Sequence, residues 1–299
     1  MSWRSGESYR PAATSLDTSV LNRIWDTMMN WTSQPARKGT AARVPYVYLT
    51  IAPLVERFRL GEGMLLAVNG CILWFGPLPR EEGMARLALS AAVLAVIYAL
   101  NDLVDCEADR PNPKKNQRLV QTFIEHRRGY AVFLAAAHTA LVTLGLAADT
   151  RVGLAVAATL AVNLGYSMRA KGTPGLDLVV VAVWGGSFAA IASTQWSICG
   201  LVGLLTLLMH VFQMDVDGEV DAGNRARTSS VAFGRTSLLV AFACVGVGAA
   251  ILPLLGGVWA ASAVVPAIAY RTARRTQTAW AWSRLYAGVT LLASVIGSI

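Results

Sequence analysis

Apolar segments of membrane-spanning length recur along most of this chain, and they constrain its fold more than any other feature. A helix needs about 20 mainly apolar residues to cross the hydrocarbon core of a bilayer. Charged residues make up 15% of the 299 residues, against about 25% in soluble domains. The sequence therefore predicts an all-α integral membrane protein with nine transmembrane helices, at residues 62–79, 84–103, 130–148, 152–168, 176–194, 197–214, 236–255, 257–272 and 280–298.

Residues 1–60 precede these segments and have a different pattern. An amphipathic helix is expected over residues 15–33, where apolar side chains recur on one face. Residues 44–55 are apolar but too short to span a bilayer, so we expect them to lie at the membrane interface. The sequence thus predicts a cytosolic or interfacial N-terminal segment, residues 1–60, and a nine-helix transmembrane domain, residues 61–299.

The distribution of positive charge predicts the orientation. Lys and Arg gather before the first expected helix and in every second loop after it, whereas the opposite loops contain only Arg80, Arg86 and Arg151. By the positive-inside rule, the N-terminus lies in the cytoplasm and, after nine crossings of the cell membrane, the C-terminus lies outside. The net charge of +8 then reflects topology and an anionic substrate, so membrane lipid is an expected partner and nucleic acid is not.

A first group of acidic residues directly follows the second expected helix, in the stretch Asn101 to Asp109. If the helix continues, Asp102, Asp105 and Asp109 lie on one face, with Asn101 one turn from Asp105. Like charges on one face repel, and a hard divalent cation such as Mg²⁺, which binds carboxylate and phosphate oxygens, relieves the repulsion. The alternative interpretation is a helix end that frays into a solvated, charged loop.

A second acidic group closes the sixth expected helix. Asp215 with Glu219, and Asp217 with Asp221, form pairs four residues apart. The two groups stand at corresponding ends of the second and sixth helices, which resembles a weak duplication of a four-helix unit. If they face one another, they could hold metal ions that clamp a diphosphate and neutralise the charge of departing pyrophosphate.

Basic residues accompany both acidic groups. Arg forks match the geometry of phosphate oxygens, and Lys supplies a point charge. For the lysines after the first group, topology alone is an alternative explanation, and for Tyr166 an interfacial aromatic position is another. The candidates for diphosphate binding are Lys115, Arg118, Tyr166, Arg169, Lys171 and Arg227.

These motifs resemble the signatures of the UbiA superfamily of intramembrane prenyltransferases. Asn101-Asp102-x-x-Asp105-x-x-x-Asp109 is similar to the first signature, and Asp215-x-x-x-Glu219, followed by Gly223 and Arg227-Thr228, is similar to the second. Tyr166 and Lys171 resemble the family's Tyr/Lys motif. Three departures stand out. Glu219 replaces the usual Asp, and a proline is missing from Asn116-Gln117-Arg118-Leu119. The Tyr-to-Lys spacing is five rather than four, so either Arg169 or Lys171 could fill the lysine's role.

The resemblance implies nine helices around a central cavity, in which an isoprenyl diphosphate ionises. It implies Mg²⁺ as cofactor and Asn101 as a residue that orients the first group or contacts diphosphate. The metal ligands implied are Asp102, Asp105, Asp109, Asp215 and Glu219, with Asp217 and Asp221 in reserve.

The function expected is transfer of an isoprenyl group from the diphosphate to a small acceptor, with an aromatic ring as the first expectation. The sequence places no evident base for an acceptor in the cavity, so a membrane terpene cyclase that uses no acceptor stays an alternative. A secondary transporter is disfavoured, because its acids should lie near mid-membrane on broken helices, whereas these lie at the ends of the expected spans.

Overall fold

The computed structural model describes residues 45–59, 64–112, 115–223, 228–234 and 289, all within one compact unit, Val44–Ile299. The described secondary structure is entirely helical, as the sequence predicts. Apart from residue 289, the last three expected membrane segments lie outside the described residues. The elements are α2 (Tyr46–Arg59), α3 (Met64–Phe75), α4 (Arg80–Asp109), α5 (Gln117–Ala148), α6 (Thr150–Gly165), the π-helical turn η1 (Tyr166–Ala170), α7 (Leu176–Ala189), α8 (Trp196–Gly223) and α9 (Ser229–Phe233).

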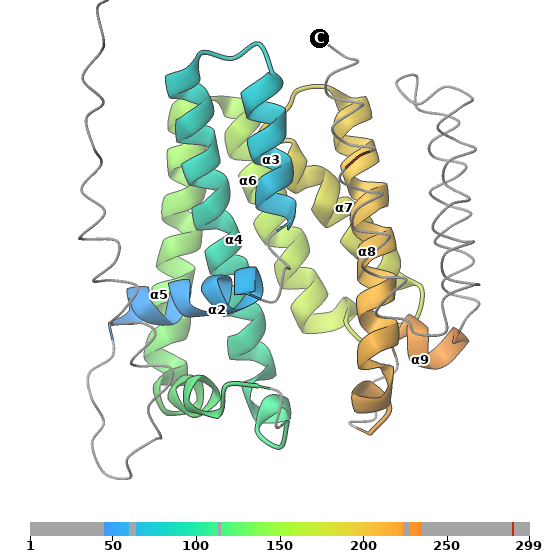
Figure 1. Ribbon diagram of the computed structural model, residues 1–299. Helices are drawn as coiled ribbons and strands as arrows, with labels where there is room; N and C mark the ends of the chain where they lie inside the picture. Colours follow the sequence, from blue (N-terminus) through green and yellow to red (C-terminus); the bar gives the residue numbers. More distant parts are fainter. Residues whose placement is uncertain (1–44, 60–63, 113–114, 224–227, 235–288, 290–299) are drawn as a thin grey trace, which may run out of the picture. The chain divides into compact units, whose positions relative to one another are not determined.

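Helices α3 to α8 correspond to the first six expected membrane segments. Among the described residues, three helical stretches are long and apolar enough to cross a bilayer, namely α4, α5 and residues Trp196–Met214 of α8. Helices α3 and α7 are apolar but shorter. Neighbours in sequence pack side by side from α3 to α8, and α3 also contacts α7 (Figure 1).

Helix α5 begins at Gln117, well before residue 130, where the sequence analysis expected it. That expectation was wrong because charged residues made this stretch look like a loop. Leu119, Phe123 and Tyr130 nevertheless form a buried stripe, with exposed fractions of 3%, 1% and 0%. The side chain of Asn116 starts the helix by accepting a hydrogen bond from the Leu119 N–H at 3.3 Å. The Asn116 cap thus starts this helix, although this sequence lacks the proline that the family motif has at this place.

Small residues bring α7 and α8 close together. A Cβ atom on Gly203 would lie 2.6 Å from the backbone oxygen of Ala182, and one on Gly185 would lie 2.2 Å from Oγ1 of Thr206. Close approach through Gly, Ala and Thr is the usual way in which membrane helices gain packing contacts. This contact fixes the helix that carries the second acidic group against α7.

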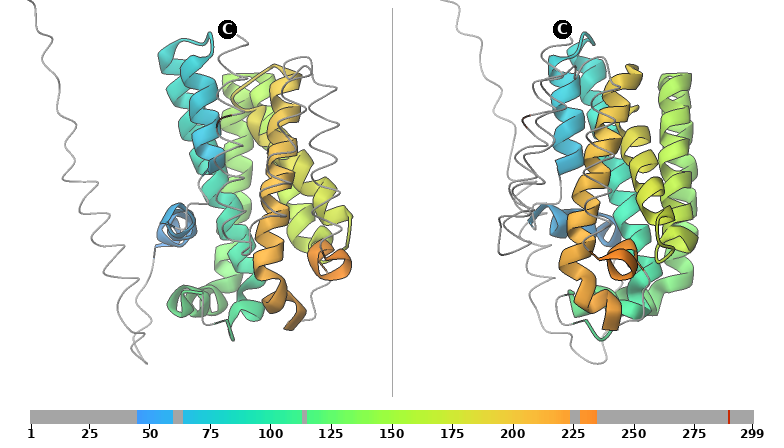
Figure 2. Two further views of the ribbon diagram at one scale, coloured as in Figure 1. Left: turned by 45° about the vertical axis from the view of Figure 1, so that its right-hand side comes forward. Right: turned by 90° about the vertical axis from the view of Figure 1, so that its right-hand side faces the viewer.

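Helix α2 lies crosswise to the long helices and packs on α4 and α5 (Figure 2). The ring of Tyr46 packs against Tyr130 of α5, with 5.6 Å between centroids. Oγ1 of Thr50 and the hydroxyl of Tyr130 share a hydrogen bond of 2.9 Å between buried atoms. These contacts hold α2 beside the end of α4 that carries the first acidic group.

Candidate functional site

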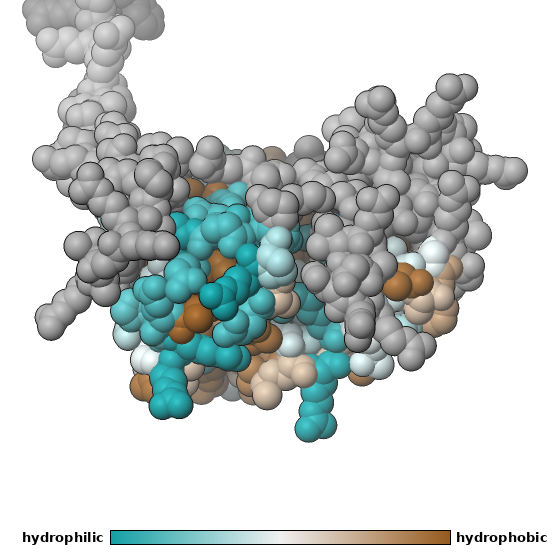
Figure 3. Space-filling view, turned by 90° about the horizontal axis from the view of Figure 1, so that it is seen from below, coloured by the Kyte–Doolittle hydropathy of each residue, from teal (hydrophilic) through white to brown (hydrophobic). Residues whose placement is uncertain are grey.

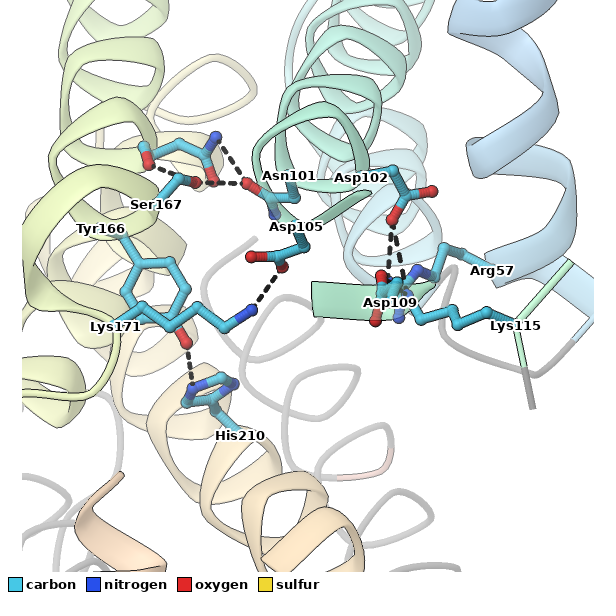
Figure 4. A network of polar contacts seen from close by, with 11 residues as sticks. Arg57, Asn101, Asp102, Asp105, Asp109, Lys115, Tyr166, Ser167, Lys171 and His210 are labelled. Carbon is cyan, nitrogen blue, oxygen red and sulfur yellow. Dashed lines mark hydrogen bonds and ion pairs between the residues drawn. The ribbon is translucent and has the colours of Figure 1, made fainter. Parts of the chain in front are cut away.

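The first acidic group lies on an unbroken helix, because α4 continues to Asp109. The alternative of a frayed loop is therefore wrong. The three aspartates pair with cationic side chains from separate segments (Figure 4). Asp102 and Asp109 share Lys115, whereas Asp105 pairs with Lys171. Each acidic residue of the motif on α4 thus has a positive side chain at its carboxylate.

Lys115 lies between two carboxylates. Its Nζ is 3.2 Å from Oδ2 of Asp109 and 3.6 Å from Oδ1 of Asp102. Burial alone lowers the pKa of Lys115, but the charges of Asp102 and Asp109 outweigh burial and raise that pKa above its ordinary value. Lys115 therefore carries a full positive charge at a point where both aspartates stabilise one.

A second cation reaches Asp102 from helix α2. Nη2 of Arg57 lies 3.5 Å from Oδ1 of Asp102, and the guanidinium stands 5.6 Å from the centre of the Tyr98 ring. Hydrophilic side chains gather around the α4–α5 connection when the molecule is seen from below (Figure 3). A hollow in this region is lined by Glu56, Asp102, Asp109, Lys115, Asn116, Leu119, Val120 and Phe123.

The π-helical turn η1 brings the Tyr/Lys motif to α4. The N–H of Lys171 donates to the oxygen of Tyr166 at 2.8 Å, which spans five residues and widens the turn. Such turns amount to one extra residue in an α-helix and are frequent at functional sites. The widened turn therefore accommodates a Tyr-to-Lys spacing of five. It brings Lys171 to Asp105, while Arg169 is exposed.

Asn101 is held by two side chains from the other wall of the site. Its Oδ1 accepts hydrogen bonds from Oγ of Ser167 at 2.6 Å and from Nδ2 of Asn163 at 3.2 Å. Asn163 is buried, with an exposed fraction of 3%. Since both partners bind the oxygen, the NH₂ group of Asn101 is not used in these two contacts.

The second acidic group is described for its backbone. Helix α8 runs to Gly223, so Asp215 and Glu219 lie one turn apart on it, as do Asp217 and Asp221. The side chains of residues 215–223, and Arg227 as a whole, lie outside the described part of the structure. That the two acidic groups face one another therefore stays a prediction.

The segment that follows the second group is fixed to the start of α7. Oδ2 of the fully buried Asp177 accepts from the N–H of Ser229 at 2.8 Å, and its Oδ1 accepts from the Ser229 hydroxyl. The N–H of Gly175 donates to Oγ of Ser229 at 2.7 Å. This link positions the N-terminus of α9. Asp177 was not singled out in the sequence, although a single acid in the first turn of an apolar helix is a signal that could have indicated it.

The donor set suits a hard divalent cation. Carboxylate and amide oxygens are the ligands that Mg²⁺ takes in proteins, and α4 presents three carboxylates on one helical face. In the described ranges, no three acidic, His or Cys side chains converge as a preformed metal site. Lys115 nonetheless occupies a point where two carboxylates stabilise one positive charge. The residues of α4 therefore fit Mg²⁺ in ligand type and charge.

The model of the UbiA prenyltransferase family matches residues 61–293. The chain belongs to this family. Members are integral membrane proteins, and the family resemblance of the sequence motifs is confirmed. Helix α2 precedes the matched residues, although it contributes Arg57 to the first acidic group.

Relatives of known structure or curated name agree with this membership. A digeranylgeranylglyceryl phosphate synthase from Methanoculleus marisnigri is 32% identical over 183 residues, which cover 55% of this chain and 64% of that protein. The match thus spans less than two thirds of the curated relative. A UbiA homolog from Archaeoglobus fulgidus bound to DMAPP and Mg²⁺ aligns with a TM-score of 0.60 and 17% identity, over 86% of this chain and 100% of that chain.

The same archaeal protein bound to GPP and Mg²⁺ gives a TM-score of 0.60 and 17% identity, over 79% of this chain and 96% of that chain. At this identity the likeness establishes the UbiA fold, in agreement with the expected all-helical, UbiA-like class, whereas the count of nine helices around a central cavity stays a prediction. Arg57, Asn163, Ser167 and His210 were not singled out in the sequence. Their partners lie far along the chain, so no local spacing marked them.

Proposed function

We propose that the protein transfers an isoprenyl group from an isoprenyl diphosphate to a small acceptor, in a Mg²⁺-dependent reaction within the membrane. The observation that carries this proposal is the convergence of cations from three separate segments on the acidic segment of α4. Arg57 comes from α2, Lys115 from the α4–α5 connection and Lys171 from the end of η1. A site that alternates carboxylates and cations in this way suits a metal-bound diphosphate.

The proposed roles follow the sequence motifs. Mg²⁺ would be held by Asp102, Asp105 and Asp109 of α4 with Asp215 and Glu219 of α8, and Asp217 and Asp221 are in reserve. When bound, the metal neutralises the charge that develops on the departing pyrophosphate. Asn101 donates its NH₂ to a phosphate oxygen. The diphosphate contacts are assigned to Lys115, Arg118, Tyr166, Arg169, Lys171 and Arg227.

The chemical step breaks the bond between the first isoprenyl carbon and the diphosphate oxygen, and pyrophosphate leaves with the electron pair. The acceptor then bonds to that carbon and loses a proton. Apolar walls of the site exclude water from the allylic cation. The similarity to the digeranylgeranylglyceryl phosphate synthase supports an acceptor of the glyceryl phosphate type. An aromatic acceptor stays the second candidate.

We further propose the complete topology predicted by the sequence. Nine helices surround a central cavity, the N-terminus and the site face the cytoplasm, and the C-terminus lies outside. Residues 1–60 form the N-terminal segment and residues 61–299 the transmembrane domain. The three described helices of membrane-spanning length support this arrangement, as do the positively charged connections beside the first acidic group.

The experiment uses protein purified in detergent with Mg²⁺ and isoprenyl diphosphates of increasing chain length. One arm has no acceptor, one has a glyceryl phosphate lipid and one has an aromatic acid. We expect adducts only when an acceptor is present, and none in EDTA. Cyclic hydrocarbons in the arm without acceptor would instead establish a terpene cyclase. Metal-independent turnover would contradict the proposed mechanism.

A further inference from the structure

Lys115 forms its ion pairs with two of the carboxylates that are proposed to hold Mg²⁺. Its Nζ lies 3.2 Å from Oδ2 of Asp109 and 3.6 Å from Oδ1 of Asp102 (Figure 4). A divalent cation held by the same oxygens would lie close to the ammonium, and the two positive charges would repel one another. Binding of Mg²⁺ by both carboxylates therefore requires the ammonium to leave them.

The backbone of Lys115 is held in place, whereas its side chain can turn. The Lys115 N–H donates to the backbone oxygen of Asn112 at 3.2 Å. Gln117, the first residue of α5, donates from Nε2 to the same oxygen at 2.6 Å. The side chain of Lys115 is 29% exposed, and its charge stands at the end of a flexible four-carbon stem. Movement of the ammonium therefore needs only rotations within the side chain.

Arg57 also contacts Asp102, but it is less suited to move. Its Nη2 lies 3.5 Å from the same Oδ1, and its guanidinium stands 5.6 Å from the centre of the Tyr98 ring. The helix that carries it, α2, packs on both α4 and α5. Asp102 thus keeps a positive neighbour when Lys115 turns away. Of the two cations, Lys115 is therefore the better placed to exchange with a metal ion.

A diphosphate supplies the new partner that the displaced ammonium needs. Its oxygens carry several negative charges, and Lys binds phosphate as a point charge. In the proposed function the metal lies between the carboxylates of α4 and the diphosphate, so phosphate oxygens come near the place that the ammonium leaves. Each ligand then makes the binding of the other more favourable, and such coupling is reciprocal.

We propose that Lys115 couples metal binding to diphosphate binding, because its ammonium competes with Mg²⁺ for Asp102 and Asp109 and turns to the diphosphate when both ligands are present. This inference rests on the proposed function, since it concerns the same metal and the same diphosphate. Mg²⁺ alone binds weakly, because part of its binding free energy breaks the ion pairs of Lys115. The site thereby favours Mg²⁺ together with diphosphate over either ligand alone.

The first test follows the ammonium itself. Wild type in detergent is treated with an amine-reactive acylating reagent, and modified Lys115 is quantified by mass spectrometry. Three states are compared at equal ionic strength: the protein alone, with saturating Mg²⁺, and with Mg²⁺ and a non-reactive isoprenyl thiolodiphosphate. An ammonium held between two carboxylates is protected from the reagent. We expect labelling of Lys115 to become several-fold faster with Mg²⁺ alone and to slow again when the thiolodiphosphate is added.

The second test measures metal binding without diphosphate, by titration with Mn²⁺ as a spectroscopic substitute that suits the same oxygen ligands. In Lys115→Met the competing charge is gone, so Mn²⁺ should bind about five- to tenfold more tightly than to wild type. Lys115→Arg keeps the charge and should bind Mn²⁺ like wild type. Arg128→Met is the matched control, because it removes a positive charge from an exposed position of α5, and it should also bind Mn²⁺ like wild type.

Labelling of Lys115 that stays constant when Mg²⁺ is added would overturn the proposal, as would equal Mn²⁺ affinity of Lys115→Met and wild type. Equal tightening in Arg128→Met would also overturn it, because the effect would then come from net charge alone. Wild type that binds neither Mn²⁺ nor the thiolodiphosphate would contradict the proposed function itself. Wild type that binds both, with labelling of Lys115 unchanged, would contradict the inference alone.

Discussion

The guanidinium of Arg57 lies 3.5 Å from the carboxylate of Asp102 and so joins helix α2 to the acidic segment of α4. Helix α2 precedes the residues that match the family model. Its aromatic and hydroxyl contacts with Tyr130 hold it at the same place. A segment that the sequence indicated only as interfacial therefore contributes a positive charge to the candidate site.

The first prediction concerns the anchoring of α2. Replacement of Arg57 by Ala removes the ion pair with Asp102, and we expect amide hydrogen exchange in α2 to become several-fold faster because local opening costs less free energy. Hydrogen exchange with mass spectrometry measures this. Arg128→Ala, on an exposed position of α5, is the control and should leave α2 unchanged. Equal exchange in both variants would mean that Arg57 does not anchor α2.

The second prediction concerns the charge balance around Lys115. In Lys115→Met, Asp102 and Asp109 lose their shared cation, so the metal-free protein should lose about 1–2 kcal/mol of stability. Added Mg²⁺ should then raise the melting temperature of Lys115→Met more than that of wild type, because the metal replaces the missing charge. Thermal unfolding with and without Mg²⁺ measures both effects. A smaller Mg²⁺ effect in the variant would count against a metal at these carboxylates.

The third prediction tests the contact between α7 and α8. Gly203→Ala places a Cβ atom 2.6 Å from the rigid backbone oxygen of Ala182, so the helices must separate and the melting temperature should fall by several degrees. Gly165→Ala is the matched control, since in the described part of the chain no atom beyond the local helical backbone lies within 4 Å of its added Cβ. A helix gains stability when Ala replaces Gly, so this control should melt at or above the wild-type temperature. Similar melting of both variants would show that the close contact is not needed.

Much of the site on α4 could be predicted from sequence. The spacing of Asp102, Asp105 and Asp109 predicts a continued helix, and α4 does continue to Asp109. Which of Arg169 and Lys171 reaches Asp105 could not be predicted, because it depends on whether the turn after α6 is α-helical or π-helical. Periodicity alone does not reveal that one-residue difference, and the hydrogen bond from Lys171 to Tyr166 does. The role of either residue in diphosphate binding stays a prediction.

Other parts depend on contacts between distant segments. The start of α5 was placed too late, since the charged residues hid the buried stripe that includes Phe123. Arg57 appeared only as one of many charges on the expected cytoplasmic side. His210 stands in no metal-ligand spacing in the sequence, so nothing local marked it. Its relation to Tyr166 exists only because η1 and α8 are folded together.

The measurement that tests the central claim most directly is Mg²⁺-dependent pyrophosphate release from an isoprenyl diphosphate, with acceptor present, by wild type and Asp105→Asn. The substitution keeps the shape of the side chain and removes its charge. Glu107→Gln, an exposed acid on the same helical segment, is the control. We predict a loss of at least about 100-fold in Asp105→Asn, with melting close to wild type and full activity in Glu107→Gln. Substantial Mg²⁺-dependent turnover by Asp105→Asn would contradict the assignment of the α4 carboxylates as the metal and diphosphate site.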